Sequence, residues 1–220
     1  MSRIHLIEFH EQSWVPAILR EGVTDYLRAV TKIAGHYGAI LPLLQTTLEE
    51  SGAQQILDLG SGAGGGWPEL QPQITTAQGD PVKVWLSDLQ PNFPAWKALK
   101  NDGNGYIDFV EAPTDARKPG HGGLRTMFNL FHHFRPSDAK AILKDASDQR
   151  QPILIIEALD DSPIQAFLIL ILAPIMVLLI TPVIRPFRWT RLLFTYLIPV
   201  IPLMVAWDGF VSILRLYSLK

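Results

Sequence analysis

The chain has 220 residues, no cysteine and a formal net charge of −2 at pH 7. The length suits one domain with an extension. The lack of cysteine excludes disulfides, thiolate nucleophiles and cysteine metal sites, and the charge argues against nucleic acid as the main partner. The first 162 residues hold 14 Lys and Arg against 20 Asp and Glu, whereas residues 163–220 hold five against one. We therefore expect the two parts to have different surroundings.

Residues 1–52 are predicted to form an N-terminal helical cover. Apolar residues recur at three- and four-residue spacing through residues 14–50, which is typical of amphipathic helices, and Gly52 supplies a stop. The first residues contain no apolar run of signal-peptide length, so a cleaved secretory signal is not expected.

Residues 53–162 are predicted to form a Rossmann-like core. Five short apolar runs predict strands at residues 55–60, 82–89, 106–112, from 124 and 152–159, with helices at 67–73, 91–101 and 137–149. Strands that alternate with helices indicate a mostly parallel sheet with helices on both faces. The expected fold class is therefore α/β.

A glycine-rich loop follows the first predicted strand, where five of the seven residues from Gly60 to Gly66 are glycine. Glycines let a ligand approach the main chain, and the next helix offers free N–H groups, so nucleotide binding is favoured over a plain surface loop. Two patterns fit. One is G-x-G-x-x-G of dinucleotide sites, through Gly60, Gly62 and Gly65; the other is D-x-G-x-G-x-G, through Asp58, Gly60, Gly62 and Gly64.

The second pattern resembles motif I of the class I S-adenosylmethionine-dependent methyltransferases, and the resemblance covers residues 15–160. It implies that the cofactor is S-adenosylmethionine, with Asp88 at the ribose hydroxyls and Asp115 of "TDAR" at the adenine. It implies further that "FNLFHHF" (128–134) lines the methyl-transfer site. The candidate cofactor residues are Asp58, Gly60, Ser61, Gly62, Gly64, Asp88, Leu89, Asp115, Ala116 and Asn129.

The chain departs from that family in two places. The 28 residues from Gly60 to Asp88 make a long gap, which "QPQITTAQGDP" would fill as an insertion. The family sheet usually has seven strands, whereas five are predicted here. Shortening of the sheet, displacement of strands by the apolar segment and truncation all stay open.

Three residues are candidates for the catalytic base, because methyl transfer needs alignment and in some cases removal of a proton. His132 and His133 follow the fourth strand, and Glu157 ends the fifth, at the sheet edge where ligands bind. Each of the three could equally be a packing or capping residue. No spacing of His, Asp and Glu predicts a metal site.

Residues 163–207 are predicted to form a hydrophobic, membrane-associating hairpin. Residues 163–184 and 192–207 carry no charge, and "RPFRWTR" (185–191) between them carries three arginines. A spanning hairpin would place these arginines outside, against the positive-inside tendency. A monotopic hairpin would keep them near anionic headgroups. A buried or dimer-forming hairpin is the third possibility, and residues 208–220 are predicted to form a helix capped by Asp208.

The sequence therefore predicts a methyltransferase at the cytoplasmic side of a membrane, peripheral or monotopic, acting on a lipophilic or amphiphilic small molecule. One alternative is a catalytically silent S-adenosylmethionine-binding scaffold protein at the membrane. The other is an NAD(P)-dependent oxidoreductase, which the first glycine pattern would suit.

Overall fold

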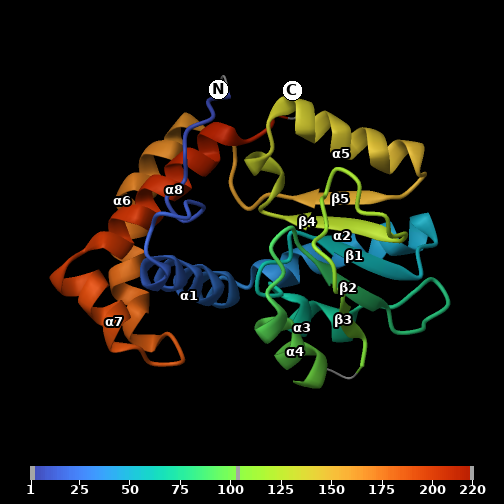
Figure 1. Ribbon diagram of the computed structural model, residues 1–220, viewed down its shortest axis with the longest axis horizontal. Coiled ribbons are helices and arrows are strands. Elements are labelled where there is room, and N and C mark those ends of the chain that lie inside the picture. Colours follow the sequence, from blue (N-terminus) through green and yellow to red (C-terminus); the bar gives the residue numbers. More distant parts are fainter. Residues whose placement is uncertain (1–2, 103–104, 219–220) are drawn as a thin grey trace. The chain divides into compact units, whose positions relative to one another are not determined.

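The computed structural model describes residues 3–102 and 105–218 (Figure 1). Contacts group the chain into two compact units. Unit 1 comprises Met1–Ala34 and Leu159–Lys220, and unit 2 comprises Gly35–Ala158. The helical residues expected to form one N-terminal cover are shared between the units. The predicted division into four domains stays a prediction.

Unit 2 is built on a five-stranded sheet in which every pairing is parallel. Its strands are β1 (Gln55–Leu59), β2 (Lys83–Ser87), β3 (Ile107–Phe109), β4 (Leu124–Phe128) and β5 (Ile153–Ile156), in the order β3-β2-β1-β4-β5. Each strand lies within one of the predicted apolar runs. The expected α/β fold class is therefore confirmed.

Helices cover the sheet of unit 2. They are α2 (His36–Ser51), α3 (Trp67–Leu70), α4 (Phe93–Asp102) and α5 (Pro136–Asp148), with single 3₁₀ turns η1 (Gln71–Gln73) and η2 (Phe131–His133). The chain moves from β1 towards β3 in one direction and from β4 to β5 in the other. Since parallel crossovers are right-handed, α3 and α4 lie on the opposite face from α5, as Figure 1 shows. The direction reverses between β1 and β4, where ligands of such sheets bind.

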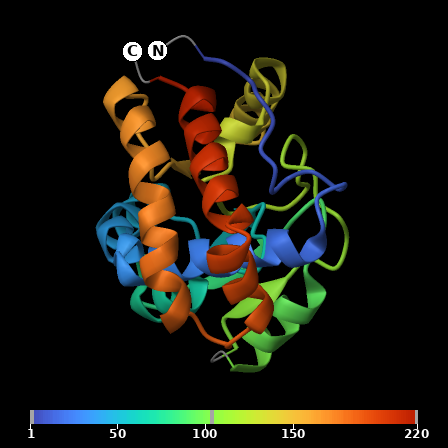
Figure 2. The same cartoon turned by 90° about the vertical axis from the view of Figure 1, so that its left-hand side faces the viewer.

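Unit 1 is helical. It contains α1 (Ala17–Ile33), α6 (Pro163–Ile180), η3 (Thr181–Val183), α7 (Trp189–Leu192), the π turn η4 (Leu193–Leu197) and α8 (Val200–Arg215). Figure 2 shows α6 and α8 side by side with α1 crossing both. Their shared core includes Val23, Tyr26, Val177 and Ile201, which are nearly inaccessible to solvent.

The last helix of unit 1 corrects the prediction that a helix begins at Asp208. Helix α8 begins at Val200, directly after Pro199, so Asp208 lies in its middle. The Asp208 carboxylate accepts hydrogen bonds from the main-chain N–H groups of Phe9, at 2.7 Å, and His10, at 3.0 Å. Asp208 therefore fastens the N-terminal segment to α8 instead of capping its own helix.

Candidate functional site

The glycine loop after β1 has a backbone that requires glycine. Gly60, Gly62, Gly64 and Gly65 have positive φ angles of 67°, 53°, 96° and 50°. A Cβ added at Gly60 would lie 2.3 Å from the Leu130 side chain, and one at Gly64 would lie 2.1 Å from Leu99. At Gly62 no other atom lies within 4 Å of such a Cβ. The loop is therefore packed on its inner side and open at Gly62.

Asp58 lies beneath this loop, with only 3% of its surface exposed. It pairs in register with Thr126 on β4, whose hydroxyl donates a 2.7 Å hydrogen bond to the Asp58 carboxylate. Burial raises the pKa of Asp58 to about 6, although the hydrogen bond from Thr126 opposes the rise. The Asp58 side chain therefore joins β1 to β4 at the point where the direction of the sheet reverses.

Ser61 and Ser87 fasten the loop to the end of β2. The Ser61 N–H donates to the Ser87 carbonyl at 2.9 Å, and the Ser87 N–H donates to the Ser61 hydroxyl at 3.0 Å. Both hydroxyls donate to the Asp58 carbonyl, at 2.9 and 2.7 Å. Sequence reasoning missed Ser87. A small polar residue at the end of an otherwise apolar strand was the available signal.

Asp88 lies at the open part of the loop. Its carboxylate accepts hydrogen bonds from the N–H groups of Gly62, at 3.0 Å, and Gln90, at 2.9 Å. The Trp96 indole, which sequence reasoning also missed, donates to the Gly62 carbonyl at 3.0 Å. Leu89, the next predicted cofactor residue, is 62% exposed. Asp88 is thus held in a fixed orientation next to the loop.

The segment after β3 is attached to the same edge, because the Thr114 N–H donates to the Asp88 carbonyl at 2.8 Å. Asp115 forms an ion pair with Arg117 at 2.6 Å, and hydrogen bonds from Arg117 lower the pKa of the Asp115 carboxyl. Ala116 is buried. Arg117 also reaches Asp138 on α5, at 3.1 Å.

Asn129 joins the ends of β4 and β5. Its φ is 49°, in the left-handed region that asparagine tolerates better than most residues. Its N–H donates to the Ile156 carbonyl at 2.8 Å, and its side-chain oxygen accepts from the Ala158 N–H at 2.7 Å. These two bonds fix Glu157, which lies between Ile156 and Ala158.

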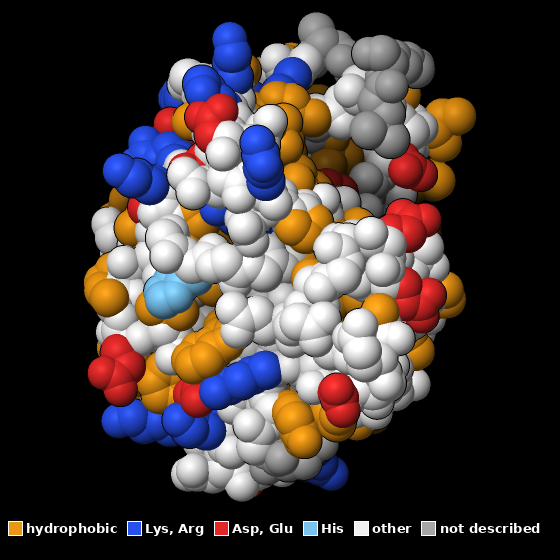
Figure 3. All heavy atoms as spheres, turned by 90° about the vertical axis from the view of Figure 1, so that its right-hand side faces the viewer, with side chains coloured by type: hydrophobic (Ala, Val, Ile, Leu, Met, Phe, Trp, Pro, Cys, Tyr) orange, Lys and Arg blue, Asp and Glu red, His pale blue; other side chains and the backbone are white. Residues whose placement is uncertain are grey.

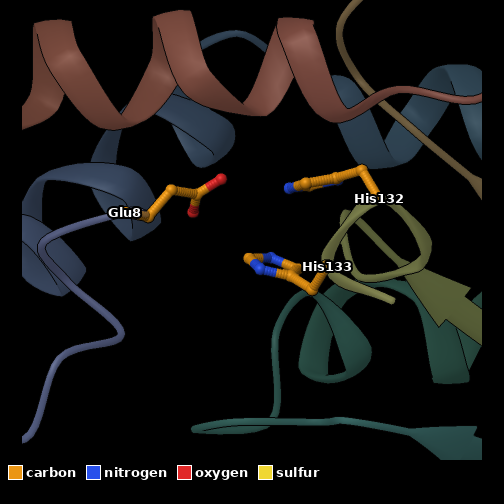
Figure 4. A group of neighbouring side chains, drawn as sticks. All are labelled: Glu8, His132 and His133. Carbon is orange, nitrogen blue, oxygen red and sulfur yellow. The ribbon is translucent and has the colours of Figure 1, made fainter. Parts of the chain in front are cut away.

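His132 and Glu157, predicted separately, form a pair. The His132 ring Nδ1 lies 2.7 Å from one carboxylate oxygen of Glu157, and its main-chain N–H donates to the other oxygen at 3.1 Å. The His132 and His133 rings are tilted by 33° with centroids 4.1 Å apart, and Figure 4 shows them side by side. A neutral imidazole that donates from Nδ1 carries its lone pair on Nε2, the arrangement of a general base.

Comparison with known proteins finds distant likeness among solved structures alone. No protein-family model matches the chain, and no curated protein matches it. Among solved structures, the chain is similar to an O-methyltransferase family protein from Burkholderia thailandensis. The identity is 20% and the TM-score 0.36, over 55% of this chain and 39% of that protein. The chain thus spans well under half the length of that protein.

Proposed function

We propose that the chain is an S-adenosylmethionine-dependent methyltransferase that acts on a proton-bearing group of a lipophilic or amphiphilic small molecule. The observation that carries the proposal is the His132–Glu157 pair at the carboxyl edge of the sheet, beside the glycine loop. Leu130, two residues before His132, packs against Gly60 of that loop. A candidate cofactor cradle and a candidate base therefore belong to one edge of one unit.

The cradle suits this cofactor in shape and chemistry. The loop is open at Gly62 and Gly65, where an added Cβ would meet no atom within 4 Å, so a ligand could approach the main chain there. The Asp88 carboxylate can accept hydrogen bonds from ribose hydroxyls, and the segment holding Asp115 and Ala116 is fixed to the end of β2. When bound, S-adenosylmethionine supplies a methyl group on a positively charged sulfur.

The His132–Glu157 pair would remove the acceptor's proton. The Glu157 carboxylate holds the ring with Nδ1–H directed at itself and stabilises the imidazolium that forms when Nε2 takes up a proton. A base is needed when the acceptor is a hydroxyl or an amine, whereas a carboxylate acceptor has no proton to lose. His133, stacked on His132, limits the rotation of that ring.

The proposed substrate class follows from the rest of the chain. Helix α6 begins six residues after Glu157 and is almost entirely aliphatic. An enzyme that carries such a helix is well suited to acceptors that partition into lipid. This part of the proposal concerns the substrate class and leaves the methyl-transfer chemistry unchanged.

Calorimetry with S-adenosylhomocysteine tests the cofactor. Wild type is expected to release heat with S-adenosylhomocysteine and none with NAD. Asp88→Ala should bind at least tenfold more weakly, because it loses the acceptor for the ribose hydroxyls and for Gly62. Asp80→Asn, an exposed acid in a turn, serves as the matched control. Heat released with NAD and none with S-adenosylhomocysteine would contradict the proposal and favour an NAD(P)-dependent oxidoreductase.

Turnover separates an enzyme from a silent binder. Wild type incubated with labelled S-adenosylmethionine and membrane lipid extracts is expected to transfer label to an extractable product. His132→Ala should bind S-adenosylhomocysteine normally but transfer no label. Binding by wild type without transfer to any extract would favour the scaffold role.

A further inference from the structure

The outward face of α6 is apolar along its whole length. Every side chain of this helix that is more than a third exposed is apolar, and Ile164, Phe167, Leu172, Ile175 and Leu179 are 46–72% exposed. The segment Pro163–Val183 has a mean hydropathy of 2.8 and is long and apolar enough to cross a membrane. By contrast, charged side chains lie among the apolar ones on the face shown in Figure 3. An apolar face this long marks a binding surface.

Hydroxyl groups next to this face are buried or already hydrogen-bonded within unit 1. Thr181 and Thr195 are buried with their hydroxyls 3.5 Å apart, and the Tyr196 hydroxyl donates to the Leu178 carbonyl at 2.5 Å. The face therefore presents almost no side-chain hydrogen-bonding group to a partner. Protein interfaces usually form about one hydrogen bond per 100–200 Å², whereas hydrocarbon requires none. This absence favours lipid as the occupant.

The arginines between α6 and α8 also differ from the expectation that they face headgroups. Arg191 is 3% exposed and pairs with Asp25 at 2.5 Å, and it donates to the Ile184 carbonyl at 2.8 Å. Arg188 pairs with Glu21. Carboxylates of unit 1 thus neutralise two of the three arginines in residues 185–191. We therefore expect this region to bind a membrane mainly through apolar contact, with little contribution from anionic headgroups.

The other side of unit 1 is suited to water. Helix α1 packs on α6 and α8 through Val23 and Tyr26 and exposes Glu21, Arg28 and Lys32. Charged side chains at the centre of a bilayer cost about 3 kcal/mol or more each, so α1 would oppose a hairpin surrounded by lipid. The return arm is also bent by 77° between the α7–η4 segment and α8.

We propose that unit 1 binds one leaflet of a lipid bilayer side-on. Helix α6 lies parallel to the membrane plane with its outward face among the acyl chains, and α1 remains in water. Trp189, which is 77% exposed, lies at the depth of the headgroups, where tryptophan is enriched. Membrane binding of this kind does not depend on methyl transfer, so either proposal can fail alone.

Vesicle flotation tests the occupant. The full chain is expected to float with phosphatidylcholine vesicles and to remain bound at high salt. The double variant Phe167→Glu/Leu179→Glu should lose binding about tenfold or more, because both residues are already exposed and their replacement leaves the core intact. Leu143→Glu, at an exposed position on α5, is the matched control and should float like wild type.

Two results would overturn the proposal. One is equal flotation of wild type and the double variant. The other is a vesicle-free dimer that the double variant dissociates, with no flotation of wild type, since a second copy would then cover the face. Circular dichroism of each variant would show that its fold is retained.

Depth measurements test the side-on orientation. Because the chain has no cysteine, Ile164→Cys, Ile171→Cys and Leu179→Cys can each carry one environment-sensitive fluorophore. Brominated lipids should quench all three probes at similar depth, and a probe at Arg28→Cys should remain accessible to aqueous quenchers. A probe at 171 that lies much deeper than those at 164 and 179 would instead show that α6 spans the bilayer.

Discussion

His132 and the carboxylate of Glu157 are joined at two points. One is the ring Nδ1, 2.7 Å from one carboxylate oxygen, and the other is the His132 N–H, 3.1 Å from the second oxygen. The main-chain bond fixes the carboxylate, and the ring bond fixes the imidazole. Both side chains are therefore held in a fixed orientation before any ligand binds.

Glu157→Gln is expected to lower kcat by about 10–100-fold, because a neutral amide supports the imidazolium less well. The variant keeps an oxygen that can accept from the His132 N–H, so the affinity for S-adenosylhomocysteine should stay within about twofold. Initial rates across pH, with calorimetry alongside, check this. A parallel loss of rate and cofactor affinity would show that Glu157 only supports the fold.

Asp58 should make stability depend on pH in the direction opposite to that of most acids. Its pKa is about 6 in the folded protein and about 4 in the unfolded chain. Between these values the folded state holds a proton that the unfolded state has lost, so the free energy of unfolding falls as pH rises. Asp58→Asn removes this effect. As the pH rises from 4 to 6, the free energy of unfolding of the variant should increase relative to that of wild type by up to about 3 kcal/mol. Above pH 6 the difference between the two proteins should stay constant.

Urea unfolding of both proteins from pH 4 to pH 8 measures that difference. Asp80→Asn, which also changes an acid to its amide but at an exposed position, is the matched control. A difference that is flat from pH 4 to 8 would mean that Asp58 has the same pKa in the folded and unfolded states, and hence that burial does not raise it.

Alanine at Gly64 and at Gly65 should have unequal effects. Both have positive φ, which costs an L-residue about 1–2 kcal/mol. At Gly64 the φ of 96° lies outside the usual left-handed region, and the new Cβ would meet Leu99 at 2.1 Å, whereas at Gly65 it would meet nothing within 4 Å. Gly64→Ala should therefore destabilise by at least about 1 kcal/mol more, as measured by urea unfolding. Equal losses would indicate that Leu99 moves aside freely.

The Arg191–Asp25 pair should show strong coupling in a double-mutant cycle. Arg191→Met leaves the Asp25 carboxylate buried without its 2.5 Å partner, which should destabilise by about 3–5 kcal/mol. The double variant Arg191→Met/Asp25→Leu should recover most of this loss, since neither charge then remains. Thermal unfolding of the two single variants and the double variant measures the coupling. Additive losses would contradict a direct interaction.

Local signals allowed most of the fold and the loop to be predicted. The strands follow from short apolar runs, and the glycine loop from residues whose backbone angles exclude side chains. The His132–Glu157 contact depends on Asn129, whose two bonds connect strand ends almost 30 residues apart in the sequence. His132 and Glu157 themselves lie 25 residues apart, so their contact could not be predicted from the sequence around either residue.

Contacts at long range explain the errors in unit 1. The sequence places a boundary at Asp208 because the uncharged stretch ends there, yet the partners of Asp208 are Phe9 and His10 at the other end of the chain. Arg191 lies 166 residues from Asp25, so its burial could not be inferred from the basic residues around it. Pro199 was the local signal that was missed, because a proline is common at the beginning of a helix and α8 begins at the next residue.

The discontinuous composition of unit 1 has a consequence for synthesis on the ribosome. Unit 2 is one continuous segment and can fold as soon as Ala158 has left the exit tunnel. Helix α1 precedes unit 2 in the chain, whereas its packing partners α6 and α8 follow unit 2, so the apolar face of α1 stays uncovered while unit 2 forms. During this interval the apolar face of α1 would be open to chaperones, and slow translation of the segment from unit 2 to α8 would prolong that exposure.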